Sequence, residues 1–160
     1  MDYVGYRVSR DGISPIPRKL EAISKFPSPT KQKHLLGFWG ALNYYRRSLP
    51  IVDGKTPAQI LQPLNDLATK HLPPKASFAK AWQKYNMQKH FDESKALLMK
   101  ATKLVHPDPA APLAMTTDAS MVAIGAVLEQ FVNGTWQPLG FWSRHLKKAQ
   151  QGWSTYRREL

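Results

Sequence analysis

The feature that most constrains the fold is a change in the spacing of apolar residues near residue 108. Before this point apolar residues recur at helical intervals. After it come three short apolar runs, PLAMTTD, VAIGAVLEQ and WQPLGFWS. Asn133-Gly134 between the last two runs is a strong β-hairpin signal. We therefore predict three consecutive antiparallel strands, followed by a loop and a helix that starts near Gln150 or Ser154.

The first 50 residues predict a small β-hairpin followed by two helices. YVGYRVS alternates as a half-buried strand does, and RDG after it is a turn signal. SPIPRKLEAISKF has helical spacing and stops at FPSP. The next helix is expected to start after an N-cap at Thr30. One face of that helix carries the expected core residues: Leu35, Phe38, Trp39, Leu42 and Tyr45.

The stretch over residues 51–108 is interrupted by prolines, which indicates a connection with one short helix near Ala58–Leu67. A helical pattern resumes over Ala79–Lys103, with four apolar anchors: Trp82, Phe91, Leu97 and Leu98. We therefore predict a mixed fold, α+β or α/β, in three parts. These are residues 1–50 with a hairpin and helices, the Pro-rich connection over 51–108, and a strand-rich part over 109–160.

Charge gives the first indication of function. The chain carries 23 Lys and Arg residues against 11 Asp and Glu, a formal net charge of +12. Residues 1–50 contribute nine of the basic and three of the acidic side chains, so the excess lies mainly toward the N-terminal side. A positive field of this kind suits a polyanion such as nucleic acid, although a solvated surface with surplus Lys would look the same.

The second helix of the N-terminal part offers a candidate nucleic-acid surface. Opposite its core face the chain carries polar, basic and aromatic side chains: Lys33, Asn43, Tyr44, Arg46 and Arg47. Arginine beside aromatic rings and an amide can hold phosphates and stack on sugars or bases. The alternative is a helix C-terminus at which Arg complements the helix dipole and Tyr packs.

Two acids are candidates for a metal site. Asp118 lies in an apolar strand, where Asp is disfavoured, and Glu159 lies in the helix expected after the three strands. Together they could share a Mg²⁺ or Mn²⁺ ion of the kind that activates water against a phosphodiester. The alternatives are a turn acid at the end of a strand and a solvated helical Glu. The chain has no Cys, which excludes a thiolate zinc site, and its five His show no metal-binding spacing.

The chain resembles the Pol polyprotein of gypsy-like long-terminal-repeat retrotransposons, across the junction from the end of reverse transcriptase into ribonuclease H. The stretches that carry the resemblance occur in order over nearly the full length: YVGYRVSRDGISPIPRKLEAISKFPSPT, LLGFWGALNYYRR, LVHPDPAAPLAMTTDAS, IGAVLEQ, GTWQPLGFWSR and STYRREL. The resemblance implies that residues 1–50 correspond to the end of the palm and the thumb. It implies that residues 109–160 correspond to the N-terminal half of a ribonuclease H-like domain.

By this resemblance Asp118 and Glu159 match catalytic, metal-binding acids, and Lys33, Asn43, Tyr44, Arg46 and Arg47 would contact an RNA–DNA hybrid or a template–primer duplex. The parent role is RNA-directed DNA synthesis and RNA–DNA hybrid cleavage. The paired polymerase acids and part of the ribonuclease H acids are absent from the sequence. We therefore expect a fragment that is inactive alone, and the sequence leaves enzyme activity undecided.

Two alternatives stay open. The chain could be a retained non-catalytic module that binds nucleic acid. It could also be an interaction module that pairs with the rest of Pol, or with itself, through an exposed sheet edge. No signal peptide or transmembrane segment is visible, so we expect no membrane association and an intracellular location, cytoplasmic or nuclear.

Overall fold

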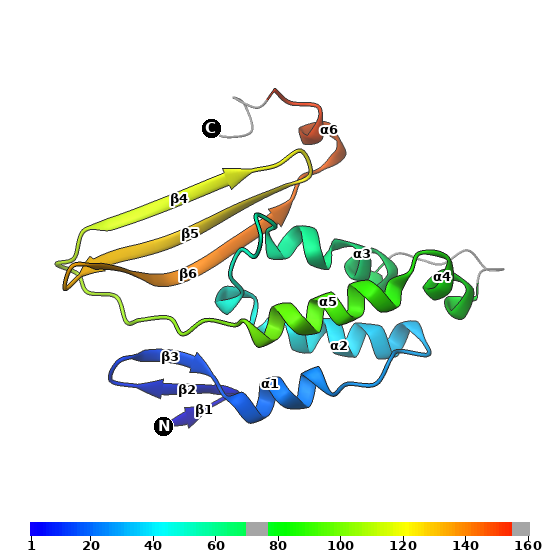
Figure 1. Ribbon diagram of the computed structural model, residues 1–160, viewed down its shortest axis with the longest axis horizontal. Coiled ribbons are helices and arrows are strands. Elements are labelled where there is room, and N and C mark those ends of the chain that lie inside the picture. The colour runs from blue at the N-terminus through cyan, green and yellow to red at the C-terminus, as the bar shows by residue number, and fades with distance from the viewer. Residues whose placement is uncertain (70–76, 155–160) are drawn as a thin grey trace.

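Two three-stranded antiparallel sheets lie beside a group of helices in the computed structural model, which describes residues 1–69 and 77–154 (Figure 1). The first sheet contains β1 (Asp2–Tyr3), β2 (Tyr6–Ser9) and β3 (Gly12–Pro15). The second contains β4 (Leu113–Ala119), β5 (Ala123–Val132) and β6 (Thr135–His145). Both sheets have their strands in chain order, as expected for meanders with short turns.

The helices fall mostly in the middle of the chain. They are α1 (Pro17–Ser24), α2 (Gln32–Tyr44), the short 3₁₀ helix η1 (Arg46–Ser48), α3 (Pro57–Thr69), α4 (Phe78–Lys84), α5 (Met87–Met99) and α6 (Lys148–Gln151). The mixed helix and sheet composition predicted from the sequence is confirmed. In the described residues, no helix combines the length and the apolar character needed to span a bilayer.

One hydrophobic core joins the helices. The predicted core face of α2 is confirmed, because Leu35, Phe38 and Leu42 are fully buried. The Phe38 ring lies 4.5 Å from the ring of Phe91 on α5, centroid to centroid. The helix predicted near Ala58–Leu67 is longer than expected, and α3 contributes Leu64 and three further residues to the same core: Leu61, Leu67 and Ala68. The Pro-rich connection is therefore packed rather than loosely attached.

The structure corrects three local predictions near the helices and the first hairpin. The expected strand over Tyr3–Ser9 is broken by a turn at Val4-Gly5, where both residues have positive φ. A β-carbon at Gly5 would lie 2.7 Å from the Tyr45 hydroxyl, so this turn suits glycine. α2 is capped by Lys31 rather than Thr30. The helix expected over Ala79–Lys103 is interrupted before α5 by Asn86, which is left-handed.

The predicted strand meander is confirmed, and its hairpin has the expected turn. Asn133 and Gly134 both have positive φ, 52° and 79°, between the paired residues Val132 and Thr135. This is the backbone that a tight two-residue hairpin requires. A short helix, α6, begins at Lys148, two residues before the predicted start near Gln150. A helix starting near the alternative, Ser154, would lie outside the described residues.

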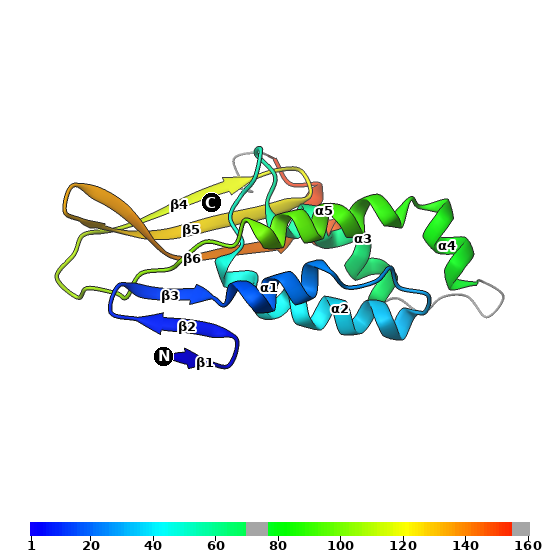
Figure 2. The same cartoon turned by 60° about the horizontal axis from the view of Figure 1, so that its bottom comes forward.

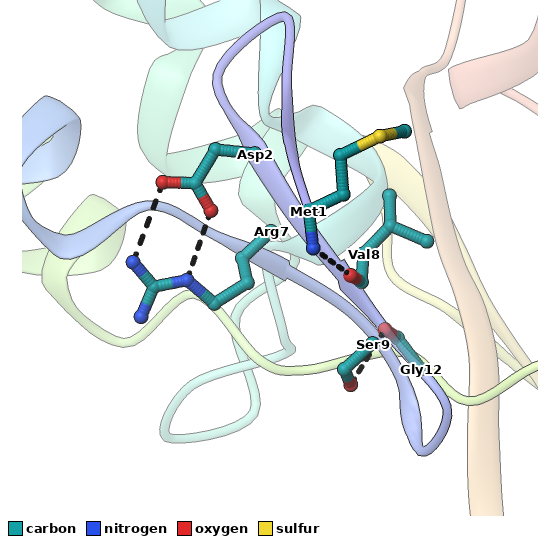
Figure 3. A network of polar contacts seen from close by, with 6 residues as sticks. All are labelled: Met1, Asp2, Arg7, Val8, Ser9 and Gly12. Atoms are coloured by element: carbon teal, nitrogen blue, oxygen red, sulfur yellow. Dashed lines mark hydrogen bonds and ion pairs between the residues drawn. The ribbon is translucent and has the colours of Figure 1, made fainter.

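The first sheet is tied at its surface by polar contacts (Figure 3). Arg7 Nε donates to Asp2 Oδ1 at 3.0 Å, and the amino group of Met1 donates to the Val8 carbonyl at 2.7 Å. The hydrogen bond from Arg7 lowers the pKa of the Asp2 carboxyl. Because both side chains of this ion pair are about half exposed, the pair adds little to stability.

A segment that follows α5 connects the two sheets. Leu104 exchanges two backbone hydrogen bonds with Ile13 of β3, 2.7 and 2.8 Å long, and the next amide, Val105, donates to Pro138 of β6 at 3.0 Å. Both ribbon views show this segment running from α5 between the sheets (Figures 1 and 2). We call residues 102–108 the bridging segment.

The bridging segment is also held by a buried side chain. Gln130 on β5 is only 3% exposed. Its Nε2 donates to the His106 carbonyl at 3.0 Å, and its Oε1 accepts from the Asp108 amide at 2.9 Å. A buried amide needs both kinds of partner, and here both come from the bridging segment.

Replacing Gly12 by Ala tests the bridge. Gly12 has φ +135°, and a β-carbon there would overlap the Leu104 carbonyl that bonds to β3. We expect Gly12→Ala to lower the free energy of unfolding by about 2 kcal/mol or more, measured by urea denaturation. Gly40→Ala is the control, because its β-carbon meets nothing within 4 Å and alanine should stabilise α2 by about 1 kcal/mol. Equal stability of Gly12→Ala and the unmodified chain would show that the bridge contributes little.

Candidate nucleic-acid interface

A groove of about 420 Å³ lies where the end of α2 meets β6, and we call it the β6 groove. Its lining residues are Asn43, Tyr44, Arg46, Arg47, Phe141, Trp142, Ser143 and Arg144. Four of the five residues predicted to contact nucleic acid are therefore brought together, and residues about a hundred positions later complete the wall. None of these lining residues carries a carboxylate, so the groove has a positive field.

Tyrosines fix the α2 side of the β6 groove. The Tyr44 hydroxyl donates to the Val4 carbonyl, and the Tyr45 hydroxyl donates to the Gly5 carbonyl at 3.2 Å. The Tyr6 hydroxyl donates in turn to the Tyr44 carbonyl at 3.2 Å. The β1–β2 turn is thereby joined to the end of α2, and the Tyr44 ring is held while 47% of the residue stays exposed.

Arg46 forms the back of the β6 groove rather than its open surface. Its Nη2 donates to the Ser143 carbonyl on β6, and its side chain is partly buried. Burial lowers the pKa of its guanidinium, which nevertheless stays charged at neutral pH. Of the two adjacent arginines, the structure gives Arg46 a packing partner and leaves Arg47 exposed.

The β6 side of the groove was missed by the sequence analysis. Trp142 is 52% exposed, and the Arg144 guanidinium lies 6.0 Å from the centre of its ring. The two residues are two positions apart on a strand, so they rise from one face. The sequence GFWSR could have predicted this wall, because its alternate, solvent-facing positions are an aromatic residue and a basic residue.

Lys33 lies apart from the β6 groove, at the other end of the same helix face. It lines a second groove of about 510 Å³ with Phe26, Pro27, Ser28, His34 and Gly37. From Lys33 to Tyr44 the helix rises about 16 Å. Between them Gly37 and Gly40 leave the helix surface bare, since a β-carbon at either would meet nothing within 4 Å. We call this stripe, continued by Arg47, the α2 face.

The structure tests the fit of a divalent metal only in part. Asp118 is exposed on β4 and pairs with Gly125, whose other neighbour is Ser143. Glu159 lies outside the described residues. Within residues 1–69 and 77–154, no group of three or more His, Asp or Glu side chains could hold a metal ion together. The described residues therefore do not complete the site, and we derive no chemical step from it.

Comparison with known proteins shows which proteins the chain is similar to. Residues 82–160 match the RNase H-like domain found in reverse transcriptase. The whole chain is 33% identical over 165 residues to the retrovirus-related Pol polyprotein from transposon opus of Drosophila melanogaster. Over 99% of the chain it is 35% identical to the Pol polyprotein from transposon 297 of the same species, and 31% identical to the transposon Tf2-3 polyprotein of Schizosaccharomyces pombe. Over its full length the chain is similar to a segment of the Pol polyproteins of retrotransposons.

The chain spans 16%, 14% and 11% of the length of those three relatives. It therefore corresponds to a limited region of Pol, the reverse transcriptase and ribonuclease H region predicted from the sequence.

Solved structures share the fold of this chain. A foamy viral protease–reverse transcriptase in complex with an RNA/DNA hybrid matches 99% of the chain with a TM-score of 0.76 at 17% identity, over 20% of its own length. The dRH form of that protein in complex with double-stranded DNA matches 100% of the chain with a TM-score of 0.77 at 18% identity, over 26% of its length. At this identity the likeness concerns architecture alone.

Substitution of each of the two adjacent arginines should have a different effect on the free energy of unfolding. Arg46→Met removes a charged hydrogen bond to Ser143, so the free energy of unfolding should fall by about 1–2 kcal/mol. Arg47→Met should leave it within about 0.5 kcal/mol, because Arg47 is exposed. Denaturant titration of both variants measures the difference. Equal effects would contradict the assignment of Arg46 to packing.

Buried tyrosines predict a loss of stability at alkaline pH. Burial raises the pKa of the Tyr45 hydroxyl above its usual 10.0 and also raises that of Tyr6. Their contribution to stability is complete below pH 10 and falls as pH rises through the folded-state pKa, because the unfolded chain ionises first. Tyr45→Phe should lose about 1 kcal/mol at pH 8 and show a shallower decline above pH 10 in thermal melts. Parallel declines for both proteins would argue against this cause.

Proposed function

We propose that this region of Pol binds a nucleic-acid duplex, an RNA–DNA hybrid or a template–primer, along the α2 face as far as the rim of the β6 groove. The observation that carries the proposal is the β6 groove itself, in which Arg47, Arg144 and Asn43 lie beside exposed aromatic rings with no lining carboxylate. Phosphate contacts come from Arg, Lys and amide side chains, and they position a duplex without reading its sequence.

The shape of the α2 face supports a duplex backbone as its ligand. Lys33 and Arg47 stand near opposite ends of a stripe whose centre, at Gly37 and Gly40, has no side chain. A bare helix surface allows close approach, and charges near both ends can hold successive phosphates. The two foamy viral proteins are in complex with an RNA/DNA hybrid and with double-stranded DNA, which makes these the first ligands to test.

The metal site belongs to the same proposal in a limited form. We propose that Asp118 and Glu159 are two of the acids that would hold Mg²⁺ or Mn²⁺, an ion that activates water toward a phosphodiester when it is bound. Because the described residues supply Asp118 alone, we assign binding rather than cleavage to the chain as it stands. We also retain the predicted intracellular location, cytoplasmic or nuclear.

A second candidate function is protein association through β4. This strand lies at one edge of its sheet and exposes Leu113 by 62% and Met115 by 69%. Unpaired strand edges with apolar neighbours are templates for another strand. The rest of Pol or a second copy could supply that strand, and sedimentation of the isolated chain distinguishes self-association from a monomer.

The binding proposal predicts a salt dependence that two residues control. Lys33→Gln combined with Arg47→Gln should weaken binding to a blunt RNA–DNA hybrid and reduce the slope of log affinity against log salt by about 2. The control is Lys80→Gln combined with Lys84→Gln, which changes the net charge equally at two exposed positions on α4. Fluorescence anisotropy over a range of salt concentrations measures both. An identical loss in both double variants would show that net charge, and not the α2 face, governs binding.

A further inference from the structure

The β6 groove differs from the α2 face in its aromatic content. Tyr44, Phe141 and Trp142 line it together with the arginines, and Tyr44 and Trp142 are each about half exposed. Bases inside a duplex are stacked on each other and present only their edges, so aromatic rings of a protein cannot stack on them. Exposed aromatic rings beside arginines in a groove are the arrangement that receives unpaired bases.

The size and construction of the groove agree with a small occupant. A volume of about 420 Å³ is in the range of small-ligand pockets, and a duplex cannot enter such a space. Trp142 pairs across the sheet with Ala126, which has a small side chain. Arg144 lies near the Trp142 ring, so a base on the ring would have a guanidinium close to its phosphate.

The two walls of the β6 groove are held together. Arg46 reaches the Ser143 carbonyl between Trp142 and Arg144, and the Tyr44 hydroxyl is tied to Val4. Preorganised walls reduce the ordering cost of binding. The groove is thus a formed site at the junction of the α2 region and the second sheet.

We infer that the β6 groove binds an unpaired nucleotide next to the duplex, stacked on Trp142 with its phosphate held by Arg144 and Arg47. The inference rests on the proposed duplex binding along the α2 face, because it makes the junction between duplex and single strand the preferred ligand. RNA and DNA both offer such a nucleotide, since every base has a face that can stack.

The test uses the 160-residue chain and three probes: a blunt RNA–DNA hybrid, the same hybrid with a short DNA overhang, and the same hybrid with a short RNA overhang. The unmodified chain should bind an overhang hybrid about tenfold more tightly than the blunt one. This is the difference in affinity expected from one base stacked on an aromatic ring. Trp142→Ala should remove this advantage, so it should weaken binding of the overhang hybrids about tenfold more than binding of the blunt hybrid.

A matched control lies on the same strand. Trp136 is 48% exposed on β6 but is not among the residues that line the β6 groove, so Trp136→Ala should keep the tenfold preference. Arg144→Gln is a second variant that keeps the indole and should reduce the preference. Thermal melting of each variant shows whether it is folded. If Trp142→Ala is unfolded, Arg144→Gln supplies the test.

The outcomes separate the two proposals. Equal affinity of the unmodified chain for blunt and overhang hybrids overturns the inference, as does an equal loss for both probes in Trp142→Ala. A different result would be a preference that depends on Trp142, together with normal binding of the blunt hybrid by the Lys33→Gln and Arg47→Gln double variant. In that case the proposed duplex site on the α2 face is wrong, and the inference that the β6 groove binds an unpaired nucleotide is supported. If the unmodified chain binds none of the probes, both proposals are wrong.

Discussion

Backbone hydrogen bonds of the bridging segment are the constraint on which the rest of the structure depends. Leu104 adds to the edge of the first sheet and Val105 bonds to the edge strand of the second. Neighbouring residues of an extended chain direct their amides to opposite sides, so one short segment can bond to both sheets at once. Gln130 then holds the following residues of the bridging segment in place.

The β6 groove follows from this arrangement, because neither sheet region builds it alone. One wall comes from the end of α2 and the other from β6, nearly a hundred residues later. Arg46 joins the two walls by donating a hydrogen bond to the Ser143 carbonyl. This contact partly buries the guanidinium, and the loss of hydration lowers its pKa. The arginine beside it, Arg47, lies at the end of the α2 face and stays exposed.

The sequence predicted a helix or strand of this fold well where a single local pattern, such as a turn motif or apolar spacing, determines it. The turn at Asn133-Gly134 and the apolar face of α2 were both readable, since backbone φ and helical spacing are local properties. The break at Val4-Gly5 was not, because it depends on a distant tyrosine. Lys33, Asn43, Tyr44 and Arg47 were recognisable by type, whereas the partnership with Trp142 and Arg144 is long-range.

Asp118 has a consequence for β4 that is independent of metal binding. It is the only ionisable residue in the sequence LAMTTDA of this edge strand, which otherwise consists of apolar and hydroxyl side chains. A carboxylate on an edge strand must lose its hydration before another strand can pair beside it, and this opposes cross-β stacking. Neutralising Asp118 would therefore make aggregation through β4 more favourable, and it would also remove a candidate metal ligand.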